Sequence, residues 1–100
     1  MANLTSLNSL ERETYVRAKG HFERGEIDPA LDDFSKLLES RENFADIHYM
    51  VGILLEQKGN LDSASESLRK ALQLNPRYAE ALLALSSILE RTGDYEKARE

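Results

Sequence analysis

Three short strings decide the fold: GEID at residues 25–28, GNLD at 59–62 and GDYE at 93–96. Each string begins with glycine, and these glycines lie 34 residues apart. The third position is apolar and the fourth acidic, and an alanine follows two residues later every time. Self-similarity at a fixed period is the signature of a repeat protein. The four matching columns therefore predict a chain built from copies of one 34-residue unit.

The segments between these strings have the spacing of helices. In residues 45–58 the apolar side chains recur at intervals of three and four, at Ile47, Met50, Val51, Leu54 and Leu55. This spacing places them on one face of an α-helix and does not fit the alternation of a strand. Residues 64–74 carry a second stripe of this kind. We predict helices at 9–24, 28–40, 44–58, 62–74 and 78–92, and a last helix from about 95.

Start and stop signals agree with these boundaries. Asn8 and Glu11 have the spacing of a capping box, in which two side chains bind the free amides of the first turn. Asp28 before Pro29 predicts a capping acid followed by proline at the first helical position. Pro76 ends the preceding helix, because the residue before proline is disfavoured in the helical conformation. The three glycines suit the left-handed backbone that closes a helix.

Composition limits the classes of function. The chain has 100 residues, 41% hydrophobic and 31% charged, which is typical of one soluble domain. A net charge of -5 argues against nucleic-acid binding, which needs a basic patch. The absence of cysteine excludes disulfides and thiolate metal sites. No apolar run approaches the roughly 18 residues of a membrane span, and residues 1–10 lack the features of a signal peptide. We therefore expect a cytoplasmic protein without membrane insertion.

The order of small and large residues identifies a family resemblance. Residues 45–78 carry it most clearly, at Val51, Gly52, Leu55, Ala64, Leu68, Ala71 and Pro76. This unit resembles the tetratricopeptide repeat, which has 34 residues in two antiparallel helices. His48 departs from the pattern, because a large apolar residue or tryptophan is usual there. The resemblance implies an all-α fold, an α-solenoid of antiparallel helix pairs with about two and a half repeats.

The repeats divide the chain into an N-terminal extension and one domain. We expect the extension at 1–10 and the domain at 11–100, with repeats at 11–44, 45–78 and an incomplete one at 79–100. The first repeat matches less well, because Thr14, Arg17 and His21 occupy places that are usually apolar. Its first helix should therefore be the least stable. An incomplete third repeat would leave a bare solenoid end, which is a candidate surface for self-association.

The sequence offers little for catalysis. His21 and His48 lie at packing positions on first helices, and no His-x-x-x-His or Glu-x-x-His pair accompanies them. We interpret the acidic pairs Asp32–Asp33 and Glu11 with Glu13 as solvated helix faces. No phosphate loop or nucleophile elbow is present. We thus expect no enzyme, no catalytic or metal-binding residues and no cofactor.

The resemblance implies where a partner would bind. In tetratricopeptide repeat proteins the first helices line a concave groove that holds a peptide or helix of a partner protein. Helical offsets give three rows here: Arg12, Tyr15, Lys19 and Phe22; then Asp46, Tyr49, Ile53 and Glu56; then Glu80, Leu83, Ser87 and Glu90. The basic first row and acidic third row predict a partner with opposite charges at its two ends.

Two interpretations of the equivalent residues Tyr15 and Tyr49 remain open. Tyrosines suit a partner surface, because they bury much area at a low entropy cost. They could equally pack helix against helix. In the first case truncation weakens partner binding, and in the second it reduces helical content.

The sequence thus predicts a protein-interaction module, a scaffold or adaptor that binds its partner in the groove. Two alternatives stay open: a homo-oligomer that associates through its solenoid ends, and the regulatory module of a longer enzyme.

Overall fold

The computed structural model describes residues 7–41 and 43–93, which form five helices and no strand. These are α1 (Ser9–Glu23), α2 (Ile27–Ser40), α3 (Ala45–Gln57), α4 (Leu61–Leu74) and α5 (Ala79–Thr92). Every boundary lies within one residue of its predicted position. The helix predicted from about residue 95 falls outside the described residues.

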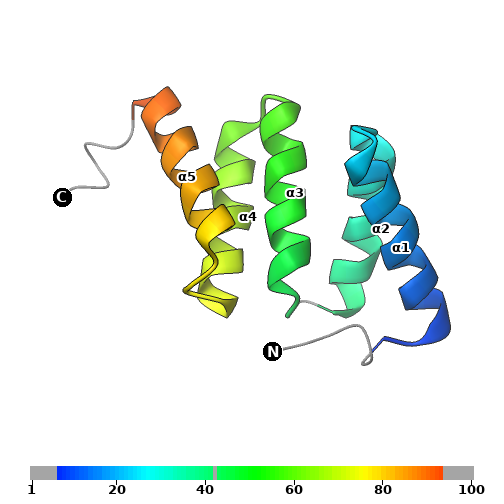
Figure 1. Ribbon diagram of the computed structural model, residues 1–100. Helices are drawn as coiled ribbons and strands as arrows, with labels where there is room; N and C mark the ends of the chain where they lie inside the picture. The colour runs from blue at the N-terminus through cyan, green and yellow to red at the C-terminus, as the bar shows by residue number, and fades with distance from the viewer. Residues whose placement is uncertain (1–6, 42, 94–100) are drawn as a thin grey trace.

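The helices stack as successive antiparallel pairs. Figure 1 shows α1, α3 and α5 side by side in one layer, with α2 and α4 behind them. Helix α1 packs on α2, and α3 packs on α4. Helix α3 also contacts α2 and α5, so it joins the neighbouring pairs. This arrangement confirms the predicted all-α solenoid.

The repeated glycines turn the chain between paired helices. Gly25, Gly59 and Gly93 have φ angles of 75°, 90° and 76°, in the left-handed region that favours glycine. After Gly25, the amide of Glu26 donates to the carbonyl of His21 at 2.9 Å. Asn60 donates to Leu55 in the same way, also at 2.9 Å. Each bond closes the last turn of a helix, as in a Schellman motif.

The helix starts agree with the sequence in one case and differ in another. The Asn8 side chain accepts from the Glu11 amide at 2.8 Å, and Glu11 Oε1 accepts from the Asn8 amide at 3.1 Å, so the capping box is confirmed. Asp28 is not the N-cap of α2, contrary to prediction. The Ala30 amide donates to the Glu26 carbonyl at 3.2 Å, so the helical ladder starts earlier. The Asp28 carboxylate instead accepts a 2.8 Å bond from Lys58.

The core runs through the stacked pairs in two clusters. The first includes the fully buried side chains of Phe34, Ile47 and Leu54, and the second those of Leu68 and Ile88. The partly buried Tyr49 and Leu55 pack against both clusters. Leu7, in the predicted extension, also belongs to the first cluster, which the sequence did not indicate. Burial of apolar area contributes roughly 25 cal/mol per Å² to folding, so these clusters hold the pairs together.

The interpretation of Asp33 and Glu11 as residues of solvated helix faces was wrong. Asp33 is buried and paired, and Glu11 is paired. Asp33 is only 6% exposed, and Arg17 binds its two oxygens at 2.9 and 3.1 Å. The hydrogen bond from Arg17 holds the pKa of the Asp33 carboxyl below its ordinary value. Glu11 accepts bonds from Ser40 and Arg41 at 2.9 and 3.2 Å.

The remaining polar residues at usually apolar places of α1 also have partners. The Thr14 hydroxyl donates to the Leu10 carbonyl at 2.9 Å, and His21 contacts Glu26. Of these positions Arg17 joins α1 to α2 through Asp33, whereas the Thr14 bond lies within α1 and His21 contacts Glu26 in the turn. As predicted, both histidines lie at packing positions, with His48 buried and His21 half-buried.

Within residues 7–41 and 43–93, no helix combines the length and apolar character needed to cross a membrane. The same residues contain no group of three or more histidine or acidic side chains that could hold a metal ion.

We predict that Gly52→Ala destabilises the protein. The new Cβ would lie 2.8 and 2.9 Å from Cγ and Cδ2 of Leu68, which is fully buried. Overpacking costs about 1–3 kcal/mol, and the better helix propensity of alanine returns about 1 kcal/mol. A net loss of about 1 kcal/mol should appear in urea unfolding followed by circular dichroism. Gly20→Ala is the matched control, since its Cβ meets only the mobile end of Arg24; it should be neutral or stabilising. Equal effects of the two variants would contradict this packing account.

We also predict that Asp33→Asn lowers stability in a pH-dependent way. Hydrogen bonds to charged groups contribute about 1.5–3 kcal/mol to stability. In the variant, the half-exposed Arg17 side chain can replace part of the lost bonding with hydrogen bonds to water, so the loss is smaller. The pKa of Asp33 is lowered on folding, so its contribution is full above the unfolded pKa of about 3.9 and is lost as pH falls below it. The variant should be about 1–2 kcal/mol less stable at neutral pH, and the difference should shrink on acidification. A difference that is independent of pH, with Asp32→Asn as control, would contradict the ion pair.

Candidate peptide-binding face

The predicted groove residues lie on one layer of the fold, formed by α1, α3 and α5 (Figure 1). We call this surface the first-helix face. Six of its predicted members are exposed: Arg12, Lys19, Glu80, Leu83, Ser87 and Glu90. Five are half-buried: Phe22, Asp46, Tyr49, Ile53 and Glu56. Tyr15 is buried.

Tyr15 is mainly a packing residue. Its side chain is 6% exposed, and its ring meets Phe34 edge-on with the centroids 6.4 Å apart. Only its hydroxyl reaches across to the second row, where it donates a 2.5 Å hydrogen bond to Asp46 Oδ2. The packing interpretation therefore describes this ring. The hydrogen bond links α1 to α3 and fixes the position of the Asp46 carboxylate.

Tyr49 is placed differently, because its ring is half-buried and stacks on a second tyrosine. The ring centroids of Tyr49 and Tyr78 lie 5.2 Å apart, with 36° between the planes. This separation is typical of favourable aromatic pairs. Tyr78 precedes α5 as its N-cap, so the pair joins α3 to the start of α5.

Sequence reasoning missed Tyr78, because it considered only positions within the first helices. A signal for it was present. Phe44, which lies 34 residues earlier, is also aromatic and also precedes a first helix, as the N-cap of α3.

Sequence reasoning also missed Arg91, whose guanidinium donates to Glu56 at 2.7 Å and ties α5 to α3.

Carboxylates surround the tyrosines. Burial, together with the negative charges of Asp46 and Glu80, raises the pKa of Tyr78 to about 12. Burial and the charges of Glu80 and Glu56 raise the pKa of Tyr49. Burial and the bond to Asp46 raise that of Tyr15. Burial and the nearby carboxylates thus both oppose ionisation of the three phenols.

The first and third rows of the face carry opposite exposed charges, as the sequence predicted. Arg12 and Lys19 are exposed on α1, where the Arg12 guanidinium also donates to the Leu7 carbonyl at 3.4 Å. Glu80 and Glu90 are exposed on α5. Leu83, also on α5, leaves 72% of its surface exposed. The face thus combines opposite charges with aromatic and apolar area.

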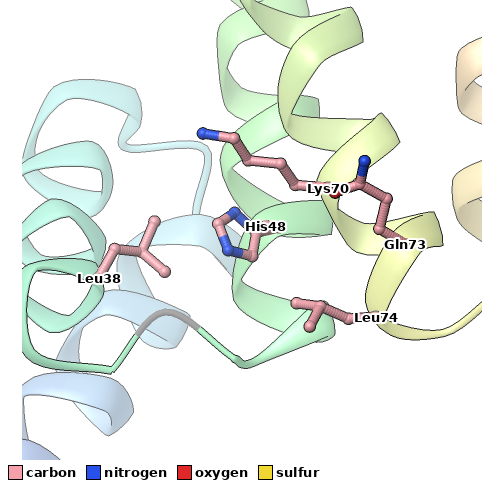
Figure 2. A pocket seen from close by; sticks show the side chains of 5 residues that line it. All are labelled: Leu38, His48, Lys70, Gln73 and Leu74. Carbon is pink, nitrogen blue, oxygen red and sulfur yellow. The ribbon is translucent and has the colours of Figure 1, made fainter.

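A separate pocket lies between α2, α3 and α4. It has a volume of about 320 Å³ and is lined by Leu38, His48, Lys70, Gln73 and Leu74. Figure 2 shows His48 between Leu38 of α2 and the three residues of α4. His48 stands where the family it resembles usually has a large apolar residue or tryptophan, and it lines this pocket. The polar side chains of His48, Lys70 and Gln73 line this pocket together with the apolar side chains of Leu38 and Leu74.

Comparisons with known proteins agree with this architecture. A family model described as the tetratricopeptide repeat matches residues 15–77 and 49–100. No sequence among curated proteins matches the chain significantly.

Solved structures of MamA have a similar fold. A MamA mutant aligns with a TM-score of 0.83 at 22% identity, over 95% of this chain and 69% of that one. MamA AMB-1 aligns with a TM-score of 0.82 at 22% identity, over 95% and 52%. MamA MSR-1 aligns with a TM-score of 0.81 at 23% identity, over 88% and 51%. The chain thus spans about half the length of these last two structures.

At such identities the likeness establishes the fold. The family model covers most of the chain and assigns it to a group of solenoids that serve as protein-interaction scaffolds. The protein is a member of the tetratricopeptide repeat family.

Proposed function

We propose that the first-helix face binds an extended segment or helix of a partner protein, and that the chain acts as a non-catalytic adaptor. The observation that carries this proposal is Leu83, a large apolar side chain that is 72% exposed on α5, the helix whose N-cap Tyr78 forms a half-buried pair with Tyr49. Aromatic and apolar side chains at the centre of a surface typically supply most of the binding energy. Membership of a family of interaction modules supports the same role.

The charges of the face support a defined orientation of the partner. Exposed cations lie on α1 and exposed carboxylates on α5. A segment with an acidic end toward α1 and a basic end toward α5 would complement both. Surface charges of this kind are screened at high salt, so the affinity should fall as salt is raised.

Tyr15 is a poor residue with which to test this proposal, because it is buried and its loss would disturb the core. Leu83 is a better one. Its exposure means that Leu83→Ala removes contact area for a partner and little core packing. Leu10 gives a close control, since it is 70% exposed on α1 and lies outside the predicted rows.

We predict that Leu83→Ala weakens the partner complex at least about fivefold, whereas Leu10→Ala leaves it nearly unchanged. The partner would first be captured from the native lysate and identified, and its affinity for each variant then measured by calorimetry. Circular dichroism should show both variants folded. An unchanged affinity for Leu83→Ala would reject the first-helix face as the binding surface.

A second candidate function is self-association through α1. Leu10 and Val16 are 70% and 63% exposed, and Val16 lines a surface hollow with Ser9, Arg12, Glu13 and Arg17. Exposed apolar area is typical of interaction sites, and both side chains belong to α1. This hollow shares Arg12 with the first-helix face but contains none of Tyr49, Tyr78 and Leu83, so variants of those three residues separate the two candidates.

For this second candidate, light scattering at high micromolar concentration should give a mass above the 11.3 kDa of one chain. The double variant Leu10→Glu and Val16→Glu should restore the mass of one chain, because two charges would be buried at the contact. A mass of one chain for the unmodified protein would exclude self-association in this range.

A further inference from the structure

We propose that the partner is anchored by a cationic side chain, preferably arginine, that binds beside Tyr49 and Tyr78 against the carboxylates of Asp46 and Glu80. We call these four residues the cation seat. This inference rests on the proposed function and names the chemistry of the partner at the centre of the first-helix face.

The first observation is the aromatic pair. The two rings lie 5.2 Å apart at 36°, and both are half-buried. Each is packed on one side against the core and keeps part of its surface accessible to a ligand. The negative face of an aromatic ring attracts a cation placed within about 6 Å of its centre.

The second observation is uncompensated negative charge. Asp46 and Glu80 form no ion pair within the described part of the chain. The neutral Tyr15 hydroxyl donates to Asp46, which orients the carboxylate without cancelling its charge. Glu56 differs, because Arg91 binds it at 2.7 Å. The seat thus has two free negative charges, and the third nearby carboxylate already has its cation.

The two observations point to one occupant. A carboxylate attracts any cation, but a planar guanidinium can also stack on a tyrosine ring while it donates to a carboxylate. An anionic side chain would meet repulsion from Asp46 and Glu80, and a neutral one would leave their charges unpaired. Burial is the main cause of the raised pKa of both tyrosines, and the neighbouring carboxylates add to it by opposing a negative charge on the phenols.

The pocket around His48 does not offer this chemistry. It carries Lys70 and Gln73 over an apolar base, and it lies between α2, α3 and α4. The first-helix face and this pocket therefore give different signatures in a residue-resolved titration.

The test is a titration of the full chain, labelled with nitrogen-15, with three blocked pentapeptides followed by NMR. The three peptides differ only in their central residue, which is arginine, citrulline or glutamate. In each peptide this residue lies between two leucines. Citrulline keeps the shape of arginine and removes its charge. We expect the arginine peptide to shift the amides around Tyr49 and Tyr78 and to bind at least about fivefold tighter than the citrulline peptide.

Variants of the seat sharpen the test. Glu80→Gln should lower the affinity for the arginine peptide about threefold or more, and Tyr49→Leu by a similar factor. Tyr49→Phe keeps the ring and should stay within about twofold of the unmodified protein. Glu90→Gln is the matched control for charge, since Glu90 is also exposed on α5 but lies outside the seat; it should change the affinity less than Glu80→Gln does.

The outcomes separate the two proposals. If the citrulline or glutamate peptide shifts the first-helix face and binds as tightly as the arginine peptide, the cation seat is wrong and the peptide-binding face stands. If no peptide shifts this face, or the shifts map to the His48 pocket, both proposals are overturned. Equal effects of Glu80→Gln and Glu90→Gln would also overturn the seat, because they would indicate attraction without a defined site.

Discussion

The close contact of α3 with α4 is the constraint on which the rest of the structure depends. Gly52 has no side chain, so Leu68 approaches to 2.8 Å and the Ala64 carbonyl oxygen to 3.3 Å from where its Cβ would be. The contact brings the two helices of the second pair together and holds α3 at the centre of the solenoid. Helix α3 contacts α2, α4 and α5, and Tyr49 packs against both core clusters. A shift of α3 would therefore disturb both the core and the first-helix face.

Polar contacts between repeats then fix the details of that face. Tyr15 joins α1 to α3 through Asp46, and Arg91 joins α5 to α3 through Glu56. Both contacts end on carboxylates of the second row, but with different consequences. The phenol leaves the charge of Asp46 in place, whereas the guanidinium compensates that of Glu56. The negative potential of the face is thereby concentrated near Asp46 and Glu80, where the two aromatic rings meet.

The local signals in the sequence predicted the helices to within one residue. Glycines at a fixed period and apolar residues at helical spacing act over a few positions, so a single chain displays them directly. The burial of Asp33 could not be predicted in this way, because its partner Arg17 lies sixteen residues away on another helix. The start of α2 was also misplaced, because Glu26 is the N-cap and the Asp28 carboxylate bonds to Lys58, thirty residues away in the chain. Tyr78 was missed for a similar reason, since its role depends on the stacking partner supplied by α3. The periodicity of the sequence predicted which residues form the rows of the first-helix face. Which of these residues are buried, and which have partners, could be seen only in the packed structure.

The central claim is that a partner binds the first-helix face through a cation held at the tyrosine pair. Its most direct test is the measurement of intermolecular nuclear Overhauser effects in a complex with the arginine peptide. The account predicts contacts between the side-chain methylenes of the bound arginine and the ring protons of Tyr49 and Tyr78. Contacts from that arginine to Leu38 and Leu74 instead, with none to the two tyrosine rings, would contradict it.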